Sequence, residues 1–320
     1  MPELEPPTID EIRAARERVR GIATRTPLVA LNADGAPARI HLKLECLQPI
    51  GSFKLRGAGN AMALADPAAL ARGVCTASAG NMAQGVAWCA RERNIPCTVV
   101  MPDHAPQTQH AAVERLGARA IRVPFDRWWQ TLVDRGHPGV EGVFIHPVSD
   151  RAVMAGNGTI GLEILEDLPE VDAVVIPYGG GGLSCGIASA LRALRPQVKV
   201  YACEVETAAP LDAALRAGAP TPVDYRPTFV DGMGGKSVLP EMWPLARRLL
   251  DGSLVVSLEA VAGAVRHLAE RNRVVAEGAG AASVAAALAG RAGGGNVVCI
   301  ISGGNIDAAK LALILQGGVP

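Results

Sequence analysis

The chain has 320 residues, of which 49% are hydrophobic and 19% charged, and its 31 basic and 31 acidic residues leave no net charge. This composition suits a compact enzyme with a sizeable core, and the length allows two domains or one large α/β unit. It indicates neither nucleic acid nor an anionic membrane surface as a partner. No apolar run has the length of a membrane span, and the acidic residues 1–5 lack the apolar segment of a signal peptide.

The seven cysteines are scattered along the chain and form no Cys-x-x-Cys pair. An odd number of scattered cysteines predicts free thiols in a reducing compartment, rather than a disulfide framework or a zinc site. We therefore expect a cytoplasmic protein.

Short apolar strands and helices alternate through the chain. Thr8 and Glu11 form a capping box that predicts a helix to about residue 20, and an extended segment follows at 26–28. In the first half, strands are expected at 40–45, 74–77, 97–101, 120–123 and 143–146, and helices at 56–64, 82–93, 103–116 and 125–135. In the second half, strands are expected at 173–177, 198–203, 254–257 and 297–301, and helices at 154–166, 183–194, 258–271, 279–289 and 306–315.

This alternation is typical of parallel α/β proteins. We expect two open, mostly parallel α/β domains with the active site in the cleft between them. The smaller domain would span residues 50–147, and the larger would combine residues 1–49 with 148–320.

Lys54 stands between a predicted strand and a helix of small residues, directly after Phe53. A lysine screened from water at such a helix start loses its proton readily, because desolvation disfavours the ammonium form. A neutral amine is what the capture of a carbonyl group requires. The alternative is an exposed lysine that extends from a helix end into solvent.

Three further segments follow predicted strands, at the sheet edge where ligands bind in open α/β proteins. Four consecutive glycines, Gly179, Gly180, Gly181 and Gly182, precede a helix that starts near Leu183. Such a loop lets the backbone approach an anion closely, and the helix start directs free N–H groups at it. A merely flexible connection is the alternative.

The other two segments carry hydroxyl groups. Ser78 opens the run to Asn81 at a second helix start, which suits a carboxylate, although ordinary capping by Ser78 is the alternative. Ser302 places a neutral hydroxyl after the last strand, where a simple turn would also fit.

Two further patterns match known motifs less well. Gly156, Gly158 and Gly161 fit the dinucleotide pattern G-x-G-x-x-G, but no strand directly precedes them. Ser184 fits the nucleophile elbow G-x-S-x-G, and the only later histidine, His267, lies in a helical pattern. A serine hydrolase that uses Ser184 therefore stays a minor alternative. The histidines form no His-Glu-x-x-His pair, so a catalytic zinc is not predicted.

These motifs, in this order, resemble those of the fold-type II pyridoxal-phosphate enzymes, in particular the threonine/serine dehydratase (ammonia-lyase) and serine racemase family. The likeness runs from about residue 8 to the end of the chain. It implies a tryptophan synthase β-like fold, pyridoxal 5′-phosphate as cofactor and a homodimer. It also implies a short catabolic form without a C-terminal regulatory domain.

The resemblance assigns roles to individual residues. Lys54 would bind the cofactor and act as the base at the substrate Cα, and Phe53 would border the pyridine ring. Asn81 would contact the cofactor's O3′ oxygen, Ser302 the pyridine nitrogen and Glu277 the surroundings of the cofactor. The backbone of residues 179–183 would bind the phosphate. The substrate carboxylate would be bound by Ser78, Ala79, Gly80, Asn81 and Met82. Ser78 and Ala79 are also catalytic candidates, together with Lys54.

The sequence departs from the family in several places. Met82 stands where many dehydratases have histidine, and Ala79 where the racemases have a second serine. Glu204 fits the first carboxylate of the family's cation site, but Pro210 occupies the second position and only Glu206 offers a substitute. A divalent cation at Glu204 is therefore doubtful.

An aromatic cluster, Phe125, Trp128 and Trp129, stands out in a chain with only 3% aromatic residues. Helix packing or a dimer contact would explain it, because exposed aromatics often mark interfaces. Alternatively, the cluster lines the substrate entrance and admits a larger substrate.

The resemblance implies a dehydratase that converts L-threonine, L-serine or a related β-hydroxy amino acid to a 2-oxo acid and ammonia. The alternatives within the fold are a serine or other amino-acid racemase, a β-replacement enzyme, and a dehydratase for hydroxyaspartate or phenylserine. A further alternative is a cofactor-binding protein without catalytic activity.

Overall fold

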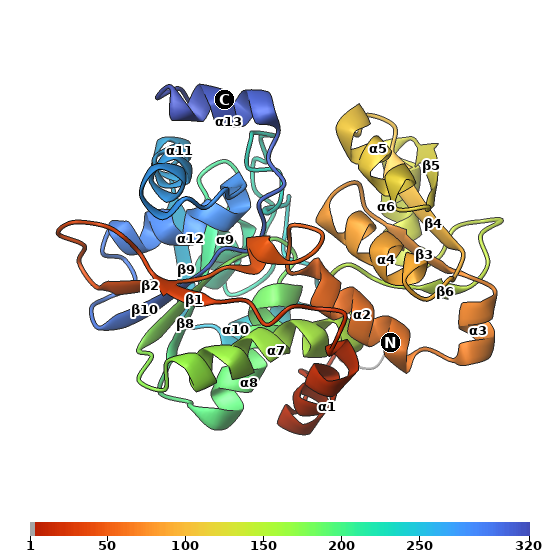
Figure 1. Ribbon diagram of the computed structural model, residues 1–320, viewed down its shortest axis with the longest axis horizontal. Helices are drawn as coiled ribbons and strands as arrows, with labels where there is room; N and C mark the ends of the chain where they lie inside the picture. Colours follow the sequence, from red (N-terminus) through yellow and green to blue (C-terminus); the bar gives the residue numbers. More distant parts are fainter. Residues whose placement is uncertain (1–3) are drawn as a thin grey trace.

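The computed structural model describes residues 4–320, so Met1, Pro2 and Glu3 of the acidic N-terminal stretch lie outside the described residues. The chain forms two separate sheets with helices packed around each (Figure 1). None of the helices in the described part is long and apolar enough to cross a membrane.

The larger sheet has six strands in the order β1-β2-β10-β7-β8-β9. Only β1 pairs antiparallel, and all other neighbours are parallel. The strands are β1 (Leu28–Ala30), β2 (Arg39–Lys43), β7 (Ala173–Pro177), β8 (Lys199–Val205), β9 (Gly252–Val256) and β10 (Asn296–Ile300).

The smaller sheet has four parallel strands in the order β5-β4-β3-β6. They are β3 (Val74–Ala77), β4 (Cys97–Pro102), β5 (Arg119–Val123) and β6 (Val143–Phe144). The prediction of two mostly parallel α/β sheets is confirmed. We propose that the small sheet belongs to a domain of residues 50–147 and the large sheet to residues 1–49 with 148–320.

The helices flank these sheets. They are α1 (Ile9–Val19), α2 (Lys54–Leu64), α3 (Pro67–Ala71), α4 (Asn81–Arg91), α5 (Gln107–Arg115), α6 (Phe125–Asp134), α7 (Arg151–Asp167), α8 (Gly182–Leu194), α9 (Pro210–Ala217), α10 (Trp243–Leu249), α11 (Leu258–His267), α12 (Gly278–Leu288) and α13 (Ala308–Leu315). A short 3-10 helix lies at Glu45–Leu47 and a π-helical turn at Leu268–Asn272.

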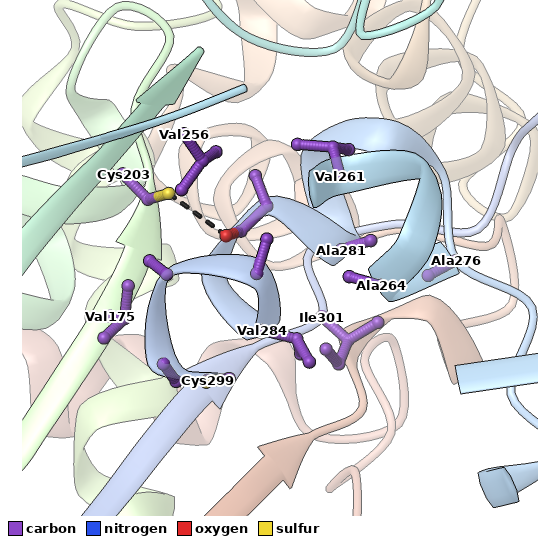
Figure 2. Packing of buried hydrophobic residues seen from close by; sticks show 14 of the residues in the cluster. Val175, Cys203, Val256, Val261, Ala264, Ala276, Ala281, Val284, Cys299 and Ile301 are labelled. Atoms are coloured by element: carbon purple, nitrogen blue, oxygen red, sulfur yellow. Dashed lines mark hydrogen bonds between the residues drawn. The ribbon is translucent and has the colours of Figure 1, made fainter. Parts of the chain in front are cut away.

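Side chains alternate between the two faces of the large sheet. On β10, Val298 and Ile300 pack on the side of α7, α8 and α10, whereas Cys299 faces α11 and α12. The small residues of α12 let it lie close to the strands, and the Cys203 thiol on β8 donates to the Ala282 carbonyl at 3.2 Å (Figure 2). Both faces are thus covered, as parallel sheets require.

Several element boundaries differ from the sequence prediction. The short helices α3, α9 and α10 were not predicted. Each has a proline in its first turn, a position that tolerates the proline ring. In the sequence alone, however, a proline suggests the end of a helix. The helix expected from residue 103 starts only at Gln107, after Pro106. The strand expected at 143–146 ends at Phe144, because the chain turns at His146.

A buried ion network joins α2 to β2 and α7. The Arg56 guanidinium donates to both carboxylate oxygens of Glu45 at 2.8 Å and to those of Glu163 at 2.6 and 2.9 Å. Lys43 adds a second cation, 2.6 Å from Glu163. Burial opposes the ionisation of Glu45, but Arg56 holds the pKa of this carboxyl below its usual value. Two buried cations therefore balance two buried carboxylates.

We expect Arg56→Met to destabilise the protein by about 3–5 kcal/mol, because it leaves two buried carboxylates with one cation. Arg13→Met is the matched control, since Arg13 pairs with Asp10 on the exposed surface and its loss costs at most about 1 kcal/mol. Urea unfolding of both variants measures the difference. Equal losses of unfolding free energy in the two variants would show that Arg56 does not balance buried carboxylates.

Candidate active site

Three strand ends meet at one edge of the large sheet, because β2, β10 and β7 are neighbours and parallel. Lys54 follows β2, Ser302 follows β10 and Gly179 follows β7. Ser78 follows β3 of the small sheet. The four predicted segments therefore all lie at carboxyl ends of parallel strands.

Backbone hydrogen bonds attach the segment before Lys54 to the segment after β10. The Phe53 N–H donates to the Ser302 carbonyl at 3.0 Å, and the Gly304 N–H donates to the Gly51 carbonyl at 2.9 Å. These bonds place Lys54 beside the end of β10, where Ser302 is buried with an exposed fraction of 3%.

The Lys54 amine is half-buried and donates to the Pro147 carbonyl at 3.1 Å. It lies 5.1 Å from the centre of the Phe53 ring, within the range of a cation–π contact. Burial lowers the pKa of Lys54 from 10.5 to about 8, although the Glu277 carboxylate opposes this shift. The amine is thus much closer to its neutral, nucleophilic form than an exposed lysine is.

Glu277 lies before the first residue of α12, and its carboxylate is buried near Lys54. Burial raises the pKa of Glu277 to about 7, and the hydrogen bond from Asn81 opposes this shift. The Asn81 amide nitrogen donates to the two carboxylate oxygens at 2.9 and 3.1 Å, and the Asn305 amide donates to the Asn81 oxygen at 2.7 Å. These bonds connect the two sheets across the site. The contact of Asn81 with the cofactor stays a prediction.

The loop predicted to bind the substrate carboxylate begins at Ser78 and leads into α4. We call it the carboxylate loop. The first turn of α4 carries free N–H donors. Gly80 is the N-cap and provides no side-chain cap, while the Ser78 hydroxyl accepts from the Gly80 N–H at 3.3 Å. The alternative of helix capping by Ser78 is therefore wrong. Within residues 4–320, no acceptor pairs with the N–H groups of Asn81 and Met82. Such a helix start can receive a carboxylate.

The four glycines form a fixed loop at the start of α8. Gly181 has φ +98°, a conformation that favours glycine. A Cβ on Gly180 would lie 2.5 Å from both γ-carbons of Val148, and one on Gly182 would lie 2.8 Å from the Val148 carbonyl oxygen. Close packing, and not flexibility, therefore requires these glycines.

The backbone N–H groups of residues 179–183 have no acceptor among the residues that the structure describes. They line the N-terminal end of α8, where the helix dipole favours negative charge. This donor set fits a phosphate group such as that of pyridoxal phosphate, and the nearby amine of Lys54 fits its aldehyde.

The dinucleotide-like glycines and Ser184 both lie inside packed helices. Gly156 and Gly158 belong to α7, where added Cβ atoms would meet the backbone oxygens of Arg56 at 2.3 Å and Gly186 at 2.8 Å, so these glycines permit helix packing. The Ser184 hydroxyl is buried in α8 without a hydrogen-bond partner in the described chain. The ring nitrogen Nε2 of His267 lies instead 2.9 Å from the Asn32 carbonyl.

The predicted cation ligands contact helix starts. The Glu204 carboxylate accepts from the N–H groups of Leu211 and Asp212, both at 2.8 Å, and from the Ser253 hydroxyl at 2.6 Å. Glu206 accepts from the Leu258 N–H at 3.0 Å. In the described range, no group of three or more His, Cys, Asp or Glu could hold a metal ion.

The aromatic cluster lies on α6, beside the small sheet. Phe125 and Trp129 are exposed, with ring centres 5.4 Å from Phe125 to Trp128 and 6.3 Å from Trp128 to Trp129. Trp128 packs against the group that contains Ala77, the residue before Ser78. The cluster therefore lies near the start of the loop that is predicted to bind the substrate carboxylate.

Sequence reasoning missed three contributors to the site: the Pro147 carbonyl, the Val148 side chain and the Asn305 amide. A backbone carbonyl has no residue-type signature, and Val148 resembles any apolar residue in a loop. Asn305 ends the segment that begins at Ser302, and it was the one polar signal that could have been used.

Comparison with known proteins agrees with this geometry. The family described as "Pyridoxal-phosphate dependent enzyme" matches residues 19–303. An L-threonine ammonia-lyase from Thermotoga maritima is 40% identical over 317 residues, which cover 98% of this chain and 79% of that protein.

Two solved structures are also similar. Maize serine racemase is 31% identical, with a TM-score of 0.90 over 98% of each chain. The processed form of threonine deaminase isoform 2 from Solanum lycopersicum is 30% identical, with a TM-score of 0.84 over 98% of this chain and 96% of that one.

We expect Gly180→Ala to destabilise the protein by about 1–3 kcal/mol, because its methyl group would overlap the Val148 side chain. Val148→Ala removes both clashing γ-carbons, so the double variant should recover part of this loss. Thermal unfolding of the two single variants and the double variant gives the coupling energy. Gly263→Ala is the control, since its methyl group would meet nothing within 4 Å. If the stability effects of the two single substitutions simply add in the double variant, Gly180 and Val148 do not pack against each other.

Proposed function

Because the chain belongs to the pyridoxal-phosphate-dependent enzyme family, we propose that it is an ammonia-lyase acting on L-threonine, L-serine or a related β-hydroxy amino acid. The observation that carries the proposal is the position of the half-buried Lys54 amine. It lies against Pro147, next to the Val148 side chain that packs on the glycine loop. The likeness to threonine ammonia-lyases supports the reaction type.

In this proposal, the N–H groups of residues 179–183 bind the cofactor phosphate and the Lys54 amine binds its aldehyde. When bound, pyridoxal phosphate supplies the electron sink that stabilises a negative charge on the substrate α-carbon. Phe53 would border the ring, with Asn81 and Glu277 beside it. Ser302 would face the ring nitrogen. As a neutral group, it does not hold a proton there as an aspartate would, which favours prompt loss of a β-substituent.

The chain's own groups then direct elimination. The free N–H groups at the start of α4, with Ser78, Ala79, Gly80 and Met82 around them, bind the substrate carboxylate. The Lys54 amine would remove the proton from the α-carbon and, as the ammonium, return it to the β-hydroxyl group, which then leaves as water. Hydrolysis of the dehydrated product gives a 2-oxo acid and ammonia.

The finer properties are also proposals. The seven free thiols support a cytoplasmic location. The exposed Phe125 and Trp129 are compatible with a homodimer contact, or with an entrance for larger substrates such as hydroxyaspartate or phenylserine. A panel of such substrates, assayed for 2-oxo acid, identifies the preferred one.

We expect Lys54→Ala to abolish both the visible absorbance of the bound cofactor and the release of ammonia, because one amine serves as anchor and base. Lys199→Ala is the control, since this lysine is exposed and pairs with Asp251. Ammonia release by Lys54→Ala above a few per cent of the wild-type rate would disprove the assignment. A wild-type protein without a visible band would point to chemistry of another kind.

Racemisation is the second candidate, because a serine racemase is among the similar structures. It needs a second proton donor opposite Lys54, within about 3 Å of the α-carbon or one water away. The racemases resembled by this chain have a serine at the position of Ala79, whose methyl group cannot donate a proton. The wild-type protein should therefore be a poor racemase.

We expect Ala79→Ser to produce measurable D-serine from L-serine while elimination persists. The half-buried loop beside a helix start should accept the hydroxyl group. Chiral chromatography after incubation of both proteins with L-serine is the measurement. If the wild-type protein racemises as fast as it eliminates, another group supplies the second proton and the enzyme is an isomerase.

A further inference from the structure

A tight turn connects β6 to α7 and is closed by the side chain of His146. The imidazole Nδ1 accepts from the Val148 N–H at 3.1 Å and from the Ser149 N–H at 2.8 Å. A ring nitrogen that accepts two hydrogen bonds carries no proton, so the neutral ring must carry its proton on Nε2. His146 is only 6% exposed, which excludes a role as a surface group.

Two successive residues of this turn face the candidate site. The Pro147 carbonyl accepts from the Lys54 amine at 3.1 Å. The side chain of Val148 fills the space beside Gly180, and its carbonyl oxygen lies beside Gly182. The turn therefore contacts both the amine and the glycine loop, which come from different elements.

Arg135 supports the turn from outside. Its guanidinium donates to the Ser149 carbonyl at 2.6 Å and to the Ser149 hydroxyl at 3.1 Å. Burial lowers the pKa of His146 to about 3, and the positive charges of Arg135 and Lys54 add to this effect. The imidazole therefore stays neutral, and stays an acceptor, over the whole range in which an enzyme works.

We propose that His146 is a positioning residue that shapes this turn, so that the Pro147 carbonyl orients the Lys54 amine and Val148 holds the glycine loop in its phosphate-binding form. Which reaction the positioned Lys54 amine carries out rests on the proposed function. The positioning by His146 itself rests only on the contacts of the turn. The ring acts through its Nδ1 acceptor and exchanges no proton.

Two substitutions of similar size separate this role from simple packing. In His146→Asn, the amide oxygen lies close to the position of Nδ1 and can accept the same two N–H groups, as in an Asx turn. In His146→Gln, the acceptor lies one bond further out and leaves both N–H groups unpaired. Loss of these buried hydrogen bonds should raise the rate of cofactor release about tenfold or more.

The measurements use the purified holoenzymes. We expect His146→Gln to release the cofactor about tenfold faster and to shift the pH at which the visible band of the bound cofactor titrates. His146→Asn should stay within about threefold of the wild type in both readouts. Far-UV circular dichroism and thermal unfolding show whether each variant is folded.

The proposal is overturned if both variants behave as the wild type does, or if both lose the cofactor equally. The second outcome includes the case in which both variants lose the cofactor because they unfold. The Nδ1 acceptor would then not be what positions the turn. Both readouts monitor the bound cofactor and not turnover. If the wild-type protein binds the cofactor but releases no ammonia, the proposed function fails and the test of His146 still stands.

Discussion

The position of Lys54 depends on the buried ion network that begins two residues later on the same helix. Arg56 contacts Glu45, which lies after β2, and Glu163, which lies on α7. An unpaired charge in this interior would cost several kcal/mol, so the three elements can meet only with all partners in place. The first turn of α2 therefore has little freedom, and the amine at its start gains a defined position.

The glycines of α7 extend this constraint to the anion loop. Gly156 touches the backbone of Arg56 on α2, and Gly158 touches the backbone of Gly186 on α8. Helices approach this closely only where no side chain separates them. The lysine helix and the helix that starts with the glycine loop are therefore both fixed against α7. The pattern that resembled a dinucleotide motif is what sets their spacing.

The sequence allowed the fold class and the four loop segments to be predicted, because hydrophobic alternation and unusual residues such as Gly179–Gly182 follow from local chemistry. It could not identify the contacts between segments distant in the chain. The Pro147 carbonyl meets Lys54 across 93 positions, and Asn81 meets Glu277 across 196. The role of Glu204 as a helix cap was also hidden, because Pro210 suggested a break and not the start of α9.

Asn81 donates to Glu277, and the charge of Glu277 acts on Lys54, so the carboxylate loop is linked to the charge of the amine. Burial raises the pKa of Glu277 to about 7 and lowers that of Lys54 to about 8, so burial acts against the charged form of both groups. Burial favours the neutral amine, whereas the charged Glu277 favours the ammonium form. Asn81 stabilises that charge by donating to both carboxylate oxygens. A movement of α4 that withdrew Asn81 would raise the pKa of Glu277, neutralise the carboxylate and weaken its attraction for the proton on Lys54. Docking of the carboxylate loop through Asn81 therefore favours the protonated amine, and its withdrawal favours loss of that proton.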